Sequence, residues 1–115
     1  MTKHLLKKGD VIMADLGEIE SVVGHEQAFH RPCIVVQSFN SLQLALVIPI
    51  TSSTKLTHYS IIKIAKGEGG LTTESYALCH QMRTISLQRI TSTRGTLPDR
   101  TFNKIRGVLR DIMEL

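Results

Sequence analysis

The stretch Gly24-His25-Glu26-Gln27-Ala28-Phe29-His30-Arg31-Pro32-Cys33-Ile34-Val35-Val36-Gln37 joins a polar loop to an apolar strand. Its second part, Cys33–Val36, is apolar and rich in β-branched residues, which is typical of a strand covered on both faces. Arg31 precedes Pro32, and a proline biases the residue before it towards an extended backbone. Loop groups held by a rigid strand often form a site, so this junction is the first candidate. Its polar side chains are those of His25, Glu26, Gln27, His30 and Arg31, and a solvated loop is the alternative interpretation.

The size and composition predict one small globular domain. The chain has 115 residues, of which 42% are hydrophobic and 21% charged, as is ordinary for a globular protein. We therefore expect a single domain over residues 1–115. Three Phe, two Tyr and no Trp leave the core to aliphatic side chains. Because a domain this small has much surface for its volume, pairing with a second copy would stabilise it.

Charge and cysteine content narrow the class of protein. The formal net charge of +4 permits a polyanionic partner but does not require one. Cys33 and Cys79 each lie in an apolar run, which indicates buried free thiols. The Cys and His spacing suggests no zinc site. No stretch is apolar enough for a signal peptide or a membrane span, so we expect a soluble, cytoplasmic protein.

Apolar runs separated by turn residues predict a mainly β protein. Strands are expected at Asp10–Leu16, Cys33–Gln37, Leu42–Ile50, Tyr59–Ile64, Ser75–His80 and Gln88–Thr93. Gly17–His30 is expected to be a long loop, which in a compact domain is usually functional or disordered. Ser38–Ser41 should form a turn, and Pro49 indicates a sheet edge or a bulge. We expect Gln81–Ile85 to leave the sheet and Arg94–Pro98 to end the last strand.

The end of the chain has a helical period instead. Pro98 and Asp99 suit the first turn of a helix. Gly107 would cost this helix roughly 1 kcal/mol relative to Ala, which predicts close packing at that position. The predicted architecture is a strongly bent antiparallel sheet with a C-terminal helix laid on it. The apolar residues at helical spacing are Phe102, Ile105, Val108, Leu109, Ile112 and Met113.

Four short blocks follow one another along the chain: Lys8-Gly9-Asp10-Val11 with Ala14-Asp15-Leu16, Gly24-His25-Glu26-Gln27 with Arg31-Pro32, Pro49-Ile50-Thr51-Ser52, and Gln81-Met82-Arg83-Thr84-Ile85. At these separations, and with a C-terminal helix, they resemble the MazF/PemK-type toxins of prokaryotic toxin–antitoxin modules. The resemblance implies a small SH3-like bent antiparallel barrel of the MazF/CcdB type and a homodimer. It also implies metal-independent, sequence-specific cleavage of single-stranded RNA or mRNA without a cofactor, and a cognate antitoxin whose acidic tail covers the RNA groove.

Cleaving RNA without a metal makes the substrate's own 2′-hydroxyl the nucleophile. The protein must then supply a base, an acid and positive charge for the phosphorane, and the products are a cyclic phosphate and a 5′-hydroxyl. Arg31 suits the charge, because a guanidinium is always protonated and matches phosphate oxygens. Its alternative role is a salt bridge with Glu26. Thr51 occupies a position that works beside the Arg in the family, and its alternative role is a turn-forming hydroxyl.

Three residues compete for the role of general base. His25 titrates near neutral pH, whereas Glu26 needs a raised pKa or acts as an orienting group. One branch of the family uses the His and another the Glu. Relatives tend to carry an acid before the Gln of the last block, where this chain has His80, and one branch adds an Arg where this chain has Leu78. His80 is therefore a replacement base or a structural histidine, and Leu78 is structural.

Further residues are candidates for binding the RNA. Arg83 suits either the RNA groove or anchoring of a loop, and Phe29 suits either base stacking or a dimer interface. We expect His30 and His58 to be solvated. The substrate-binding candidates are Gln27, Phe29, Ser52, Gln81 and Arg83.

Two other functions fit part of the pattern. One is a non-catalytic protein that binds a target enzyme, as the gyrase-poisoning relatives of this fold do. Those relatives end in a Trp-containing tail, whereas this sequence has no Trp, and Arg31 and Thr51 have no role in such a mechanism. The other is a protein that binds RNA without cutting it, because the acid expected at position 80 is absent.

Overall fold

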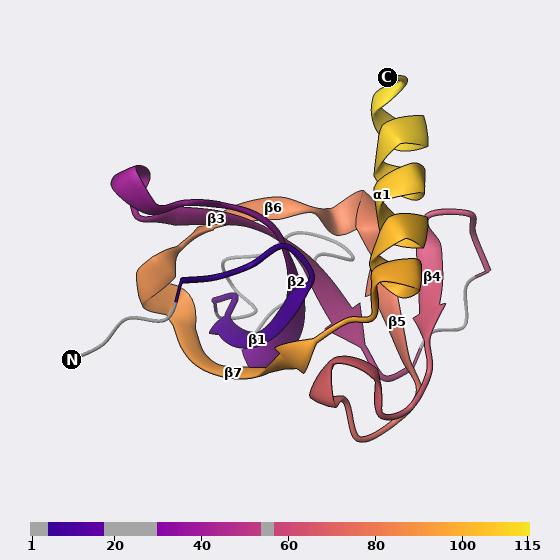
Figure 1. Cartoon of the computed structure of the whole chain (residues 1–115), viewed down its shortest axis with the longest axis horizontal. Helices are drawn as coiled ribbons and strands as arrows, with labels where there is room; N and C mark the ends of the chain where they lie inside the picture. The colour runs from indigo at the N-terminus through magenta and orange to yellow at the C-terminus, as the bar shows by residue number, and fades with distance from the viewer. Residues whose placement is uncertain (1–4, 18–29, 54–56) are drawn as a thin grey trace.

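Seven antiparallel strands and one helix make up the part of the chain that this computed structural model describes, residues 5–17, 30–53 and 57–115 (Figure 1). The strand order is β4-β5-β3-β2-β1-β7, and β6 pairs with β3. The expected mainly β fold with a C-terminal helix is confirmed. The strands are β1 (Asp10–Asp15), β2 (His30–Phe39), β3 (Leu44–Thr51), β4 (Ile61–Ile64), β5 (Ser75–Leu78), β6 (Arg83–Ser86) and β7 (Ile90–Thr96), and the helix is α1 (Asp99–Met113). Short 3-10 turns lie at η2 (Asn40–Leu42), η3 (Glu68–Gly70), η4 (Cys79–Gln81) and η5 (Leu87–Arg89).

Strand β3 is the centre of the sheet. It pairs with β2 on one side, while on the other side Leu44–Val47 pair with β6 and Ile50 and Thr51 pair with β5. The sheet divides at this change of neighbour. Pro49 lies between the ladders to β6 and β5, so its missing N–H interrupts neither of them. The sequence led us to expect a sheet edge or a bulge at Pro49. Strand β3 is an inner strand as a whole, but within the described part of the chain Pro49 itself has a ladder partner only on the β2 side.

The two faces of β2 and β3 contribute to two separate apolar clusters. Ile34, Ile48 and Ile50 lie in one cluster, and Val35 and Val47 lie in the other. This division follows from the period of two along a strand, which sends successive side chains to opposite faces. Because both faces are covered, the strands are continuous apolar runs, as the sequence predicted.

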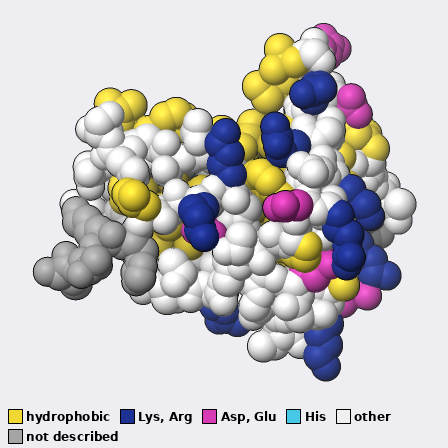
Figure 2. All heavy atoms as spheres, in the orientation of Figure 1, with side chains coloured by type: hydrophobic (Ala, Val, Ile, Leu, Met, Phe, Trp, Pro, Cys, Tyr) yellow, Lys and Arg dark blue, Asp and Glu magenta, His cyan; other side chains and the backbone are white. Residues whose placement is uncertain are grey.

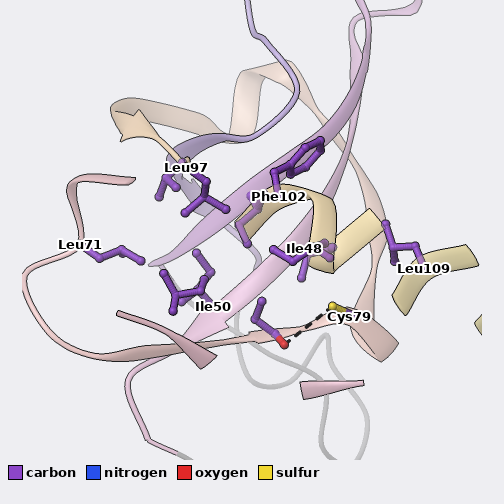
Figure 3. Packing of buried hydrophobic residues seen from close by; sticks show 12 residues of the cluster. Ile48, Ile50, Leu71, Cys79, Leu97, Phe102 and Leu109 are labelled. Carbon is purple, nitrogen blue, oxygen red and sulfur yellow. Dashed lines mark hydrogen bonds between the residues drawn. The ribbon is translucent and has the colours of Figure 1, made fainter. Parts of the chain in front are cut away.

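Helix α1 covers the first of these clusters (Figures 1 and 3). Figure 3 shows Phe102 and Leu109 from the helix lying against Ile48 from β3. Two expectations for the helix are wrong. Gly107 is exposed, and a Cβ there would meet nothing within 4 Å, so no close packing explains it. Met113 is 52% exposed because it lies in the last turn, beyond the sheet-facing residues.

Several strand boundaries differ from those expected. Strand β2 begins at His30 and not at Cys33, because His30 and Arg31 pair with β1. It also runs through the expected turn as far as Phe39, which pairs with Leu44. Residues 83–86 form β6 instead of leaving the sheet, because the free side of β3 accepts them.

Strand β7 continues to Thr96, beyond the break expected at Arg94. The reason is the pairing of Gly95 and Thr96 with Val11 and Asp10 of β1. Gly95 also packs closely on η3, since a Cβ there would lie 2.9 Å from the carbonyl carbon of Gly69 and 3.0 Å from the nitrogen of Gly70. Strand β5 ends at Leu78, two residues earlier than expected, and Cys79 and His80 belong to η4.

The first sequence block has a structural role at the start of β1. Gly9 has a φ of +90°, which favours glycine, and its N–H donates to the carbonyl of Val35 at 2.8 Å. The carboxylate of Asp10 accepts hydrogen bonds from the Lys7 N–H at 2.8 Å and from the Thr96 hydroxyl at 2.7 Å. Gly9 and Asp10 therefore join the start of β1 to β2 and β7.

The two cysteines are free and buried, as expected. Burial raises the pKa of the Cys33 thiol to about 12 and that of the Cys79 thiol to about 11. Both therefore remain protonated and serve as small apolar side chains. Over the described part of the chain, no helix is long and apolar enough to cross a membrane.

We predict opposite stability changes for two glycine-to-alanine substitutions. Gly95→Ala forces β7 away from η3 and should lower the free energy of unfolding by about 1–3 kcal/mol, as overpacking does. Gly107→Ala meets no neighbour and should raise it by roughly 0.5–1 kcal/mol, because alanine favours the helix. Urea denaturation of both variants measures the difference. Equal effects of the two substitutions would contradict the packing of Gly95 described above.

Candidate active site at the ends of the central strands

Arg31 lies near the start of β2, opposite Ala14 of β1. On its other side β2 pairs with β3, and Cys33 is opposite Pro49. Arg31 lies two residues from Cys33 on β2, and Thr51 lies two residues from Pro49 on β3. Side chains two residues apart on a strand point to the same face, so Arg31 and Thr51 share the face of Cys33 and Pro49. The structure therefore brings together the two residues that sequence reasoning ranked first.

Thr51 continues a row of polar side chains across the neighbouring strands. It lies opposite Tyr76 of β5, and Tyr76 lies opposite Lys63 of β4. Side chains of directly opposite residues share a face and have Cβ atoms about 4.5–5.5 Å apart. Arg31, Thr51, Tyr76 and Lys63 thus follow one another across four strands, and we call them the polar row. Sequence reasoning missed Tyr76 and Lys63, because only the strand register relates them to Thr51.

The members of the polar row already have partners in the free protein. The Thr51 hydroxyl donates to the carbonyl of Ser53 at 3.0 Å, so the turn-forming role considered from the sequence is present. Glu74 accepts a hydrogen bond from the Tyr76 hydroxyl at 3.0 Å and lies 3.2 Å from the Lys63 ammonium. The Glu74 contact raises the pKa of Tyr76, so its phenol remains a donor at neutral pH. A hydroxyl can rotate, so Thr51 can turn to a ligand by leaving Ser53.

A second group of polar residues surrounds His80 in η4. Its Nδ1 lies 2.9 Å from the hydroxyl of Ser60, which in turn lies 2.6 Å from Nδ1 of His58. The Ser60 N–H also donates to Nδ1 of His58 at 3.2 Å. We call these three residues the His58–Ser60–His80 chain. The expectation that His58 is only solvated is wrong, and Ser60 gave no signal in the sequence.

The polar row and the His58–Ser60–His80 chain lie at different places along β5. Thr51 is opposite Tyr76, and His80 is four residues further along the chain. Two residues of strand and two of 3-10 turn separate them by on the order of 10 Å.

The remaining candidates are placed as follows. Nη1 of Arg83, on β6, donates to the carbonyl of Leu16 at 3.4 Å, which fits the anchoring role. Gln81 ends η4, and Ser52 is exposed directly after Thr51. His30 is not simply solvated, because its Nε2 lies 2.7 Å from the Thr91 hydroxyl. His25, Glu26, Gln27 and Phe29 lie outside the described residues.

Exposed cations are dispersed over the surface. On the face shown in Figure 2, Lys and Arg side chains occur at several separate places and do not form one continuous patch. Within the described ranges, no group of three or more His, Cys, Asp or Glu side chains gathers as metal ligands would.

The fold is that of a small protein with a bent antiparallel sheet and a C-terminal helix. The polar row adds cations and hydroxyl groups near the ends of its central strands. Residues 7–113 match the family described as PemK-like, MazF-like toxin of type II toxin-antitoxin system. The chain belongs to this family. Endoribonuclease EndoA of Bacillus subtilis (strain 168) is 32% identical over 113 residues, which cover 92% of each chain.

Solved structures share the fold at lower identity. MazF from Deinococcus radiodurans superposes with a TM-score of 0.81 at 19% identity, over 98% of this chain and all of that one. A mycobacterial endoribonuclease in complex with its cognate antitoxin has a TM-score of 0.76 at 18% identity, over 96% of this chain and 97% of that one.

We predict that His80 titrates below its ordinary pKa of 6.5, first because of burial and second because of the nearby charge of His58. His58→Asn should therefore move the pKa of His80 upwards, which NMR titration of the imidazole protons measures. Because the folded pKa is the lower one, His80 contributes stability above pH 6.5 that is lost as the pH falls through the folded pKa. A titration midpoint at or above 6.5 in the wild type would contradict the partial burial of this ring beside Ser60.

Proposed function

We propose that this chain is an endoribonuclease toxin that cleaves single-stranded RNA by attack of the substrate's own 2′-hydroxyl. Membership of the PemK/MazF toxin family and the relationship to Endoribonuclease EndoA support the proposal. The observation that carries it is the placement of Arg31 and Thr51 at equivalent positions of β2 and β3, on one face of the sheet. A guanidinium beside a hydroxyl matches the oxygens of a phosphodiester.

The proposed reaction needs no group beyond the protein and the RNA. A base removes the proton of the 2′-hydroxyl, the 2′-oxygen forms a bond to phosphorus, and the bond from phosphorus to the 5′-oxygen breaks. Arg31 and Thr51 donate to the non-bridging oxygens and stabilise the charge of the phosphorane. The leaving 5′-oxygen takes up a proton, which gives a 2′,3′-cyclic phosphate and a 5′-hydroxyl. His80 is our candidate base among the described residues, beside His25 and Glu26 outside them.

The polar row extends this site to neighbouring nucleotides. Tyr76 offers a phenol donor, and Lys63 is an exposed cation that forms a surface ion pair with Glu74. Surface ion pairs contribute little, so Lys63 can exchange Glu74 for a phosphate. Tyr59 is 59% exposed and lies with its ring 4.6 Å from that of His58, which offers a surface on which a base can stack. We propose Gln27, Phe29, Ser52, Gln81 and Arg83 as further substrate contacts.

The partners follow from the same proposal. A cognate antitoxin would cover the site, as the antitoxin complexes of related folds suggest. We further propose a homodimer in the cytoplasm, where mRNA is available. Exposed apolar side chains such as Leu42, 65% exposed, and Phe39, 39% exposed, favour burial against a second copy. Light scattering of the purified chain tests the dimer.

We expect the purified protein to cut a long single-stranded RNA at one short motif in the presence of EDTA. Mapping should find cyclic-phosphate and 5′-hydroxyl ends. Arg31→Ala should lower the cleavage rate by about 10²-fold or more, as loss of one charge-stabilising donor does. Arg31→Lys should restore only part of the rate, because lysine lacks the planar fork.

Circular dichroism and the thermal midpoint of each Arg31 variant serve as the control for folding. Full activity of a folded Arg31→Ala variant would remove Arg31 from the reaction. Tight RNA binding without any cut by the wild type would support the non-catalytic RNA-binding alternative instead.

We also predict that Lys63 contributes one phosphate contact. Lys63→Ala should weaken RNA binding about equally for all sequences and reduce the slope of log affinity against log salt by about 0.7, the value for one contact to a single strand. Lys66→Ala is the matched control, because Lys66 is also exposed but follows β4 and lies outside the polar row. Equal effects of the two variants would remove Lys63 from the RNA-binding surface.

A further inference from the structure

Ser60 lies between two imidazole rings and is almost completely buried. Ser60 is 1% exposed, and its hydroxyl oxygen lies 2.6 Å from Nδ1 of His58 and 2.9 Å from Nδ1 of His80. A hydroxyl has one proton, so it donates to one of these nitrogens and accepts from the other. The two histidines therefore hold different protonation states at Nδ1.

The backbone decides which histidine is the acceptor. The Ser60 N–H points at Nδ1 of His58 at 3.2 Å, so this nitrogen carries no proton. It accepts from both the N–H and the hydroxyl of Ser60, so the ring proton of His58 lies on Nε2. Since the hydroxyl proton is directed to His58, the Ser60 oxygen accepts from His80, whose Nδ1 therefore carries a proton. These assignments follow from the hydrogen-bonding network.

This arrangement leaves Nε2 of His80 without a proton whenever the ring is neutral. Nε2 lies on the opposite side of the ring from Nδ1, and the His80 residue is exposed although its Nδ1 contacts the buried Ser60. Burial opposes protonation of the ring, and protonation of the neighbouring His58 would oppose it further. A histidine whose Nδ1–H is held by an acceptor, with Nε2 available, has the arrangement of a general base.

We propose that Ser60 and His58 are positioning residues that hold His80 in the Nδ1–H tautomer, with Nε2 as the base for the RNA 2′-hydroxyl. This inference rests on the proposed function. Nε2 takes the 2′-hydroxyl proton while the 2′-oxygen bonds to phosphorus and the bond to the 5′-oxygen breaks. The resulting imidazolium of His80 keeps the hydrogen bond from its Nδ1–H to the Ser60 oxygen. The Ser60 hydroxyl keeps its hydrogen bond to Nδ1 of His58. The 5′-oxygen, released from phosphorus, takes up a proton from the His80 imidazolium or from solvent.

The chain supplies variants that separate positioning from folding. Ser60→Ala removes the acceptor for His80. His58→Asn keeps an oxygen acceptor where Nδ1 of His58 lies, whereas His58→Ala removes it. His80→Asn keeps a donor where Nδ1–H lies but has no basic nitrogen. Thermal midpoints of all four variants report folding.

The first measurement is the tautomer of His80 in the free protein, from long-range ¹H–¹⁵N NMR correlations of the labelled imidazoles. We expect a protonated Nδ1 in the wild type and in His58→Asn, and a mixture of tautomers in Ser60→Ala. A protonated Nε2 in neutral His80 of the wild type would overturn the inference. This measurement does not depend on any activity.

The second measurement is the pH dependence of single-turnover RNA cleavage. The wild-type rate should rise with pH up to the pKa of His80 and then level off, and His80→Asn should lose this limb. Ser60→Ala and His58→Ala should lower the maximal rate by about 10- to 100-fold, as loss of an orienting partner does, with KM unchanged. His58→Asn should retain most of the rate.

The two measurements distinguish the inference from the proposed function. Normal cleavage and an unchanged pH limb in Ser60→Ala would overturn the positioning role while leaving the endoribonuclease intact. A wild-type protein that cuts no RNA would overturn the proposed function, and with it the catalytic role of His80, whatever tautomer is found.

Discussion

The pairing of β3 with three other strands is the constraint on which the rest of the structure depends. Its residues pair with β2 on one side and with β6 and then β5 on the other. Both faces of β3 are consequently buried, which removes Ile48 and Ile50 from water on one side and Val47 on the other. Burial of large aliphatic side chains is the main stabilising contribution to a fold of this size, at about 1.5–3 kcal/mol each. Polar functional groups are therefore absent from the buried middle of β3.

The polar groups accordingly collect where the strands end. Thr51 is the last residue of β3 and directly follows the buried Ile50, and Arg31 is the second residue of β2 and lies two residues before the buried Cys33. Arg31 pairs with Ala14 of β1 and Thr51 pairs with Tyr76 of β5, so both side chains start from backbone positions that a strand ladder fixes. A rigid scaffold with functional groups at its rim is the arrangement that positions a phosphate with little loss of entropy. Arg31 thus belongs to the sheet, as a residue of β2.

Position 80 illustrates how a departure from the family pattern is accommodated. The resemblance implied an acid at this position, whereas this chain has a histidine, and a neutral hydroxyl and a second histidine lie beside it. An ionised carboxylate has no proton to donate, so it could not donate a hydrogen bond to the Ser60 oxygen. The Nδ1–H of His80 can donate to that oxygen. The three residues of the His58–Ser60–His80 chain are therefore mutually consistent, although 20 residues of sequence separate Ser60 from His80.

The sequence by itself determined the mainly β class, the C-terminal helix, the buried thiols and the pairing of Arg31 with Thr51 as the leading candidates. These depend on local periodicity and on short blocks, both of which are visible along the chain. Only the tertiary structure decided that residues 83–86 rejoin the sheet, that β7 continues through Gly95, and that Ser60 lies between two histidines. The reason is physical: a strand's neighbours, the fit of a glycine against a distant backbone and the direction of a hydroxyl proton all depend on residues far apart in sequence. The polar row of Arg31, Thr51, Tyr76 and Lys63 is likewise a property of register, which no single strand encodes.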